Sequence, residues 1–512
     1  MSNTIGRALR GFLVFTFALA ASLATTAPAG AGLTADATFD SDGFAQVNFA
    51  SGLDAARDLA VQADGRYVLV GLSRQTTGPN TFDYLAATRL SDDGSLDTDF
   101  GTSGLVTLLP GGTPLNFGGA DARAVAIQPA DQKIVIAGGW NVNDGVGYHV
   151  FVTRLASNGT PDPTFGAGGS VVLDLPGVWD AIAEGIVIRG DGSILVCGGA
   201  NDPSIQKGFI IRLTDAGALD TTFATGGVFA IQNPAVPQAY FSFTAVTELS
   251  GGAIVAVGDG EDLAVVKLTG TGVPDATFSG DGVANFNYTS ATVGDFQVGS
   301  YENAYGLAIQ NDGKILVAGS TRDPLGPQTD ALVARVTTAG ALDTSFGASG
   351  YAFVPNLKSD EVAYDIVLRS SGDMVVAGLD FKPVQFSPNG KMLSQYSGFY
   401  PPQALLGLSV LDDDRVVGAG EQNISGLNYQ FVAIRMNATD LAEEGCDVCG
   451  EVNGDCKVTA SDALAVLKMA VGSLATNLSG DMNGDGKITA SDALAVLKLA
   501  VGSGTPTDAC KA

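Results

Sequence analysis

The chain has 512 residues, with 27 basic and 54 acidic side chains, a formal net charge of −27 at pH 7, and 68 glycines. This charge balance excludes nucleic acid as a partner, because phosphates would repel the chain and no cluster of lysine and arginine offsets that repulsion. The glycine content indicates a soluble, turn-rich, largely β protein, and the acidic excess favours divalent cations as ligands.

Residues 1–31 have the pattern of a signal peptide. Arg7 and Arg10 precede an apolar run over 12–24, and small residues follow at 29–31. The alternative is a retained membrane anchor, but the apolar run is shorter than the roughly 20 residues that a spanning helix needs. We expect cleavage after Ala31 and export to the cell surface or medium, with no membrane span after the signal is removed.

From residue 33 to residue 440 the sequence repeats with a period of about 60 residues. A basic residue closes an apolar run, an aspartate follows eight positions later, and a phenylalanine and a glycine come after the aspartate. The basic and acidic pairs are Arg89 and Asp97, Arg154 and Asp162, Arg212 and Asp220, Lys267 and Asp275, and Arg335 and Asp343. A turn and a short apolar run ending in glycine lie between these junctions, seven times in all, at Gly71, Gly138, Gly198, Gly258, Gly319, Gly378 and Gly420.

The recurrent junction residues have structural roles that need no ligand. We expect the basic residue and the aspartate to pair, the phenylalanine to wedge between units, and the glycine to adopt a positive φ. Function is then expected in the loops that differ between units. Aromatic rings in those loops either stack on a sugar or peptide ligand or are buried as anchors. They are Trp140 in the insertion 140–147, then Tyr240, Phe241 and Phe243, then Tyr288, Phe296, Tyr301 and Tyr305.

Each repeat contains four short apolar runs of strand length. In one repeat they are 170–175, 183–188, 193–197 and 208–213, separated by clusters of glycine, aspartate, asparagine and proline. Four antiparallel strands repeated seven times predict a seven-bladed β-propeller, because packing the units around an axis buries faces that one unit would expose. Residues 33–49 are expected to close the ring against a strand over 430–436. Repeats six and seven are degenerate, with Phe386 and Tyr396 where the pattern is weakest.

The repeat also resembles a known family. The segments ALDTSFGASG, NDGKILVAGSTRD and ALVARVTTAG are similar to the delta-60 repeat of large secreted bacterial proteins, and the resemblance covers roughly residues 33–440. It is fairly specific for the repeat and implies almost nothing about activity.

No catalytic residue is identified in the sequence. His149 is the single histidine, and the G-x-S-x-G, H-E-x-x-H and Walker patterns do not occur. We therefore expect a protein that is not an enzyme. A pair of carboxylates that cleaves polysaccharides stays open as the alternative, because aspartates are abundant and a sequence does not show their separation in space.

After residue 440 two nearly identical segments follow, EVNGDCKVTASDALAVLKMAVGS and DMNGDGKITASDALAVLKLAVGS. Each places oxygen donors at the alternating positions of a calcium loop and continues into an amphipathic helix. The alternative is a pair of ordinary turns before such helices. The predicted ligands are Asp481, Asn483, Asp485, Lys487 through its backbone carbonyl, Thr489 and Asp492 in the second loop, and Glu451, Asn453, Asp455, Lys457, Thr459 and Asp462 in the first.

The first loop departs from the pattern, because Glu451 replaces aspartate at position 1 and Cys456 replaces glycine at position 6. A left-handed conformation there costs roughly 1–2 kcal/mol for a residue with a Cβ. The first loop is therefore expected to bind calcium more weakly than the second.

The duplicated segment resembles a type I dockerin, a family whose loops have aspartate at position 12. The resemblance implies two bound Ca²⁺ ions and calcium-dependent docking to a cohesin-like module of another protein. It also implies recognition by loop positions 10 and 11 and by two helix positions in each copy, so that identical copies permit two binding orientations. These residues are Ala460, Ser461, Leu467, Lys468, Ala490, Ser491, Leu497 and Lys498.

The cysteines divide between the two regions. Cys446, Cys449, Cys456 and Cys510 fall in the C-terminal region and in an exported protein indicate two disulfides, with three pairings open. Because the ends of that region are expected to lie together, Cys510 should bond to Cys446 or Cys449. Zinc or redox roles are the alternative for the C-x-x-C pair, and Cys197 is expected to be buried and unpaired.

The sequence thus predicts a signal peptide over 1–31, a propeller over 33–440 and a small helical EF-hand-like calcium module over 445–512. We interpret the protein as a secreted calcium-binding platform that docks to a cohesin-type or cell-surface partner. A carbohydrate ligand, and a link to polysaccharide binding or breakdown, are part of this interpretation.

Overall fold

The computed structural model describes residues 32–438, apart from short stretches, together with Ala493, Leu494 and Val496. The stretches left out are 50–51, 78–79, 113–117, 142–146, 176–179, 202–205, 233–240, 261, 287–290, 294–295, 299–301, 323–328, 355–359, 398–401, 403 and 426–427. The predicted signal peptide lies outside the described residues.

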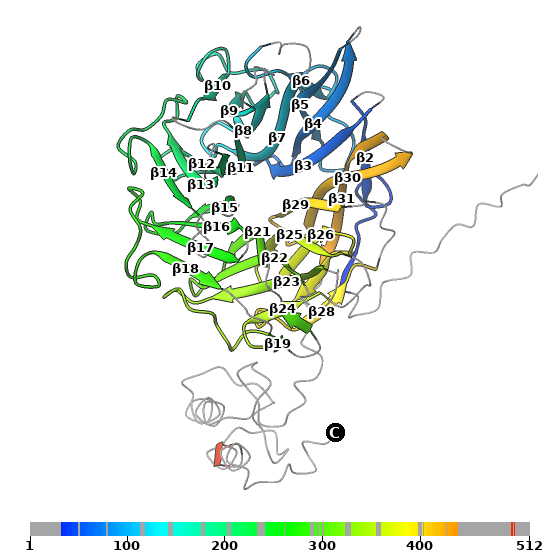
Figure 1. Cartoon of the computed structure of the whole chain (residues 1–512). Coiled ribbons are helices and arrows are strands. Elements are labelled where there is room, and N and C mark those ends of the chain that lie inside the picture. Colours follow the sequence, from blue (N-terminus) through cyan, green and yellow to red (C-terminus); the bar gives the residue numbers. More distant parts are fainter. Residues whose placement is uncertain are drawn as a thin grey trace, which may run out of the picture.

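The described chain is an all-β propeller, in which four-stranded antiparallel units follow one another around a central opening (Figure 1). In each unit the first strand lies next to the opening and the fourth lies at the rim.

The first units are β3 (Asp54–Val61), β4 (Tyr67–Thr77), β5 (Asn80–Leu90) and β6 (Leu105–Leu108); β7 (Gly118–Ile127), β8 (Ile134–Asn141), β9 (Tyr148–Leu155) and β10 (Ser170–Leu173); and β11 (Asp180–Ile188), β12 (Ile194–Asn201), β13 (Gln206–Leu213) and β14 (Val228–Gln232). Next come β15 (Ser242–Glu248), β16 (Ile254–Asp259), β17 (Leu263–Leu268) and β18 (Val283–Phe286), and then β21 (Glu302–Ile309), β22 (Ile315–Arg322), β23 (Thr329–Val336) and β24 (Tyr351–Phe353). The last are β25 (Val362–Leu368), β26 (Met374–Leu379), β27 (Val384–Phe386) and β28 (Met392–Gln395), and β29 (Ala404–Val410), β30 (Val416–Ser425) and β31 (Asn428–Ala438). A separate hairpin joins β19 (Ala291–Val293) to β20 (Phe296–Val298).

The middle strands are apolar on both faces because each face packs on a different neighbour. In β8, Ile134 and Ile136 pack with side chains of the preceding unit, whereas Val135 and Ala137 pack with those of the following unit. Successive side chains of a strand point to opposite faces, so a continuous apolar run is what two buried faces require. The repeated runs of the sequence are therefore the cores between units.

The first and last strands of the propeller close the ring together. β2 (Phe44–Val47) pairs antiparallel with β31, with Phe44 opposite Ile434, and β1 (Leu33–Ala35) pairs with the end of the same strand, with Leu33 opposite Ala438. The predicted closure of residues 33–49 against 430–436 is confirmed. Closure supplies a fourth strand to the last unit and pairs the edge of β31 that would otherwise be free.

Neighbouring units are joined by a recurrent set of contacts, which we call the latch. The basic side chain near the end of the third strand donates to the aspartate eight residues later over 2.7–3.0 Å. In the arginine copies the guanidinium lies 4.7–4.9 Å from the centre of the following phenylalanine ring, and Nη1 donates to a backbone carbonyl of the next unit. The same set occurs at the closure, where Arg435 donates to Asp36 and stacks on Phe39.

The other latch residues have the predicted roles as well. Phe100 and Phe165 are fully buried and pack against Gly159 and Gly217, which are turn glycines of the next unit. Gly169, which follows Phe165, has a φ of 101°, a conformation that a side chain rarely permits. The predictions of pairing, wedging and positive φ are therefore confirmed.

The latch is missing where the sequence pattern is weakest. Gln385 stands in the place of the arginine and Leu393 in the place of the aspartate, while Tyr396 is a buried substitute for the phenylalanine. Arg369, in the turn after β25, instead donates to the carbonyls of Asp414 and Ala438 over 3.3 and 2.7 Å. A different arginine thus joins these units.

Candidate functional site: a pocket on the propeller axis

The recurrent glycine at the end of each apolar run has a steric reason. It lies in the second strand of its unit and faces the first strand, and at Gly71 a Cβ would overlap the carbonyl oxygen of Ala55. Gly138 and Gly198 have the same relation to Asp121 and Ile182. Only a residue without a side chain permits this approach of the two backbones.

Opposite each of these glycines the innermost strand contains a β-bulge. A bulge inserts one extra residue and re-aims its side chain. The described residues include seven such bulges, and the extra residues are Arg57, Arg123, Glu184, Thr244, Tyr305, Tyr364 and Leu406.

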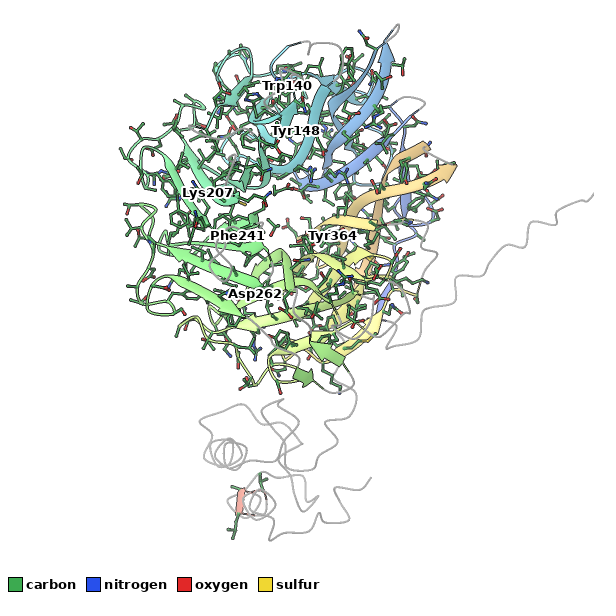
Figure 2. All side chains as sticks on the ribbon, viewed as in Figure 1. Trp140, Tyr148, Lys207, Phe241, Asp262 and Tyr364 are labelled. Atoms are coloured by element: carbon green, nitrogen blue, oxygen red, sulfur yellow. The ribbon has the colours of Figure 1, made fainter. Side chains whose placement is uncertain are left out.

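All of these bulge residues line one pocket, together with Ser242. The pocket has a volume of about 330 Å³ and lies on the axis, because each unit contributes its innermost strand. Figure 2 shows Tyr364 beside the central opening, while Trp140 lies toward the rim. The repeat therefore presents one variable side chain per unit to a shared site.

Charged groups occupy one side of this pocket. Arg123 donates to Asp121 over 2.7 Å and to Glu184 over 3.2 Å. Arg57 lies farther from its carboxylates, 3.7 Å from Asp121 and 3.8 Å from Glu421. Burial raises the pKa of Glu184, although the charge of Arg123 opposes that rise. The same burial acts to lower the pKa of Arg123, but Glu184 and Asp121 raise it, so the arginine stays charged.

The other side of the pocket is aromatic and hydroxylic. Tyr305 and Tyr364 come from consecutive units, and their rings meet edge to face with centres 5.1 Å apart. Thr244 donates from its hydroxyl to the carbonyl of Ala304 over 2.9 Å, which ties the neighbouring bulge in place.

Two partly buried aspartates hold the bulges. Asp58 follows Arg57 and accepts hydrogen bonds from the amides of Leu59 and Val125, over 2.7 and 2.8 Å, so it joins the first two innermost strands. Asp365 follows Tyr364 and does the same with the amides of Ile366 and Leu408, over 2.8 and 2.7 Å. Burial raises the pKa of both carboxyls to about 7.

Most of the sites predicted from the sequence fall outside the described residues. Apart from the helical Ala493, Leu494 and Val496, the C-terminal region lies outside the described residues. The two calcium loops, the cohesin-binding positions and the four C-terminal cysteines therefore stay predictions. In the part of the chain that is described, no group of three or more histidine, cysteine, aspartate or glutamate side chains is placed to hold a metal ion, and no helix is long and apolar enough to cross a membrane.

The remaining predicted residues have clear positions. Cys197 is buried and unpaired, as expected. The Nδ1 atom of the single histidine, His149, lies 2.6 Å from Oδ1 of Asp174. Trp140, Phe241 and Phe243 are buried anchors rather than exposed rings, whereas Tyr305 lines the axial pocket. Tyr240, Tyr288 and Tyr301, and the side chain of Phe296, lie outside the described residues.

The axial pocket was missed in the sequence, although a signal for it is present. Each bulge residue stands 14 positions before a recurrent glycine, or 15 before Gly138. The glycines were recognised as landmarks of the repeat, but the variable position that they imply on the preceding strand was not. The expectation that function lies in variable loops therefore overlooked a variable position inside a strand.

Fold and pocket together define a β-propeller with a polar pocket on its axis. Comparison with protein families agrees with the repeats: residues 62–100, 130–165 and 310–346 match the "Domain of unknown function (DUF5122) beta-propeller", which is of the delta-60 repeat type. Residues 450–500 match the dockerin type I domain. A search of curated proteins finds no match.

Several solved structures are similar to this chain at low identity. They include the polysaccharide lyase Uly1, with 10% identity, a TM-score of 0.41, and coverage of 75% of this chain and 90% of that one. A mutant of the alpha-l-arabinofuranosidase arb93a from Fusarium graminearum has 11% identity and a TM-score of 0.40, covering 76% and 93%. A protein of unknown function from Dyadobacter fermentans has 14% identity and a TM-score of 0.39, covering 80% and 100%.

Proposed function

We propose that the protein is a secreted binding platform that docks to a cohesin-like module through its C-terminal region in a calcium-dependent manner. The observation that carries the proposal is the dockerin type I match over residues 450–500, which spans nearly the whole of both predicted calcium loops and the helices after them. The signal-peptide pattern at 1–31 supports export, and the propeller supplies the ligand-binding part. In this proposal the protein binds and assembles and is not an enzyme.

We further propose that the propeller has seven blades. The strand pairings support this number, because the units from β3 to β31 each contribute one bulge residue to the axial pocket. The closing latch supports it as well, since Arg435 and Asp36 bring the last unit onto the first.

Two Ca²⁺ ions are proposed for the C-terminal module. Carboxylate and carbonyl oxygens alternate along each loop, which is the donor set that a hard cation requires. Without the ions the clustered carboxylates would repel one another, so ion binding and helix formation should be coupled. The contact with the partner would then fall on the loop and helix positions named above, such as Ser461 and Ser491.

The test is calorimetry on the full chain with calcium, followed by capture on a panel of cohesin modules. Asp485→Ala and Asp455→Ala are matched variants, because both remove the position 5 ligand from otherwise similar loops. We expect Asp485→Ala to abolish the tighter site and Asp455→Ala only the weaker one, and chelation to abolish capture. Calcium binding that is absent, or capture that survives chelation, would remove the docking proposal.

An extracellular hydrolase built on the propeller is the second candidate. One observation favours it: Glu184 lines the axial pocket with a raised pKa, beside Asp121, which is the kind of environment that tunes a general acid. Turnover of polysaccharides that disappears in Glu184→Gln, with an unchanged fold, would establish the enzyme and overturn the binding proposal.

A further inference from the structure

A side chain that lines the axial pocket and its ion-pair partner have polar atoms whose hydrogen-bonding capacity is unused. The Nε atom of Arg57 and the Oδ1 atom of Asp121 are buried and have no hydrogen-bond partner. They lie 3.7 Å apart, which is an ion-pair distance but too long for a hydrogen bond. Leaving such groups unpaired in a buried position is costly, so a donor and an acceptor at this spacing favour binding of a polar ligand.

The charges of the pocket select among polar ligands. The side chains that line the pocket include two guanidinium groups, of Arg57 and Arg123, and one carboxylate, of Glu184. Two further carboxylates, of Asp121 and Glu421, lie within 4 Å of these guanidinium groups, so the formal sum of the whole charged cluster is +2 − 3 = −1. A ligand with a net negative charge gains little from such a site. A neutral ligand that both donates and accepts hydrogen bonds can satisfy the arginine and the carboxylates together.

The aromatic side selects the shape of the ligand. Tyr305 and Tyr364 belong to units that lie across the axis from those of Arg57 and Arg123, so a ligand in the pocket meets charge on one side and ring surface on the other (Figures 1 and 2). Saccharides have this division, because hydroxyls surround the edge of the ring while its faces carry C–H groups. A volume of about 330 Å³ lies at the lower end of the range for small-ligand pockets.

We propose that the axial pocket binds a neutral saccharide. The guanidinium of Arg57 and the carboxylate of Asp121 bind its hydroxyls, and Tyr305 and Tyr364 contact a face of the sugar ring. Asp58 and Asp365 are positioning residues, because each fixes the strand just after a pocket side chain. This inference rests on the platform role proposed for the propeller, but not on docking by the C-terminal region.

The experiment measures binding of cellohexaose, xylohexaose, mannohexaose and hexagalacturonate to the full chain by calorimetry. We expect at least one neutral oligosaccharide to bind and hexagalacturonate to bind more weakly. Arg57→Gln and Tyr364→Ala should each weaken binding by about tenfold or more. Arg74→Gln is the matched control: it removes an arginine and its 2.7 Å pair with Asp83, neither of which lines the pocket, and should change affinity less than about twofold.

The outcomes separate this inference from the docking proposal. Circular dichroism shows whether each variant is folded, and Tyr364→Phe, which keeps the ring, should retain binding if a variant at 364 is otherwise unstable. Saccharide binding should persist with chelator while cohesin capture is lost. Four outcomes would overturn the saccharide site and leave the docking proposal standing. They are no binding of any of the three neutral oligosaccharides, tighter binding of hexagalacturonate, equal effects of Arg57→Gln and Arg74→Gln, or binding only to a peptide library.

Discussion

Replacing Asp36 by alanine tests the closing latch. Asp36 accepts from Nε of Arg435 and Nη1 of Arg415, each over 2.6 Å, and from Thr38. The side chain of Arg435 is only 1% exposed, so loss of Asp36 leaves a buried guanidinium supported by the exposed Asp92 at 2.8 Å. Breaking a buried pair costs about 3–5 kcal/mol, and the remaining partner favours the lower end. With an unfolding entropy of about 2.1 cal/mol/K per residue over roughly 400 residues, a loss of about 3 kcal/mol lowers Tm by about 4 °C.

This stabilisation should be fully present at neutral pH. Burial acts to raise the pKa of Asp36, but hydrogen bonds from Thr38 and Arg415 and the charge of Arg435 lower it to about 2. A lowered folded-state pKa means that the contribution is present above the unfolded value near 4 and is lost as the pH falls toward 2. The difference in Tm between the wild type and Asp36→Ala should therefore shrink in acid.

Asp162→Ala is the matched control, because Arg154 is equally buried and also keeps an exposed second carboxylate, Asp215 at 3.0 Å. Both variants should lose similar stability by calorimetry. In urea-jump kinetics Asp36→Ala should unfold faster, because Asp36 lies on the segment that closes the ring, whereas Asp162 lies within continuous chain. Equal unfolding rates, or no loss of Tm in either variant, would refute the argument that closure limits unfolding.

Three further predictions follow from other parts of the chain. Burial raises the pKa of the Asp58 carboxyl to about 7, so the folded protein binds this proton more tightly than the unfolded chain does. The free energy of unfolding should therefore fall by at most about 4 kcal/mol as the pH rises from 4 to 7. Asp58→Asn should reduce this dependence of Tm on pH in thermal scans, and an unchanged dependence would count against the argument. Gly138→Ala should lower stability by about 1–3 kcal/mol and weaken saccharide binding, because its Cβ meets the carbonyl of Asp121; a neutral effect on both would contradict the account of the bulge. Peptide mapping of the oxidised protein should pair Cys510 with Cys446 or Cys449, and four free thiols would contradict the predicted staple.

The sequence predicted the latch well because its residues act at fixed short spacings. Arg335 and Asp343 are eight positions apart in one connection, so their pairing needs no knowledge of distant strands. Closure was also predictable, since residues 36–43 supply the half of a junction that is missing after Arg435.

The axial pocket was not predicted because it depends on register. Arg57 reaches the axis only because the strand slips by one residue opposite Gly71, and hydrophobic alternation does not report such a slip. The contact that replaces the latch in the sixth unit could not be predicted for a similar reason. Arg369 donates to the carbonyl of Asp414, which is 45 residues away, so no short sequence spacing reports the pair. The calcium loops lie outside the described residues, so their prediction stays untested.

The position of the closing strand has a mechanical consequence. The chain leaves the propeller through β31 on its way to the dockerin-like region, so tension applied to a docked protein enters at Ala438. That strand is hydrogen-bonded to β30 on one side and to β1 and β2 on the other. Three residues before the exit, Arg435 holds Asp36, Thr38 and Tyr67. The exit strand β31 is thus held by the first strands of the propeller as well as by its last unit. A force applied at Ala438 is therefore shared between these strands instead of peeling one strand from the edge of a sheet.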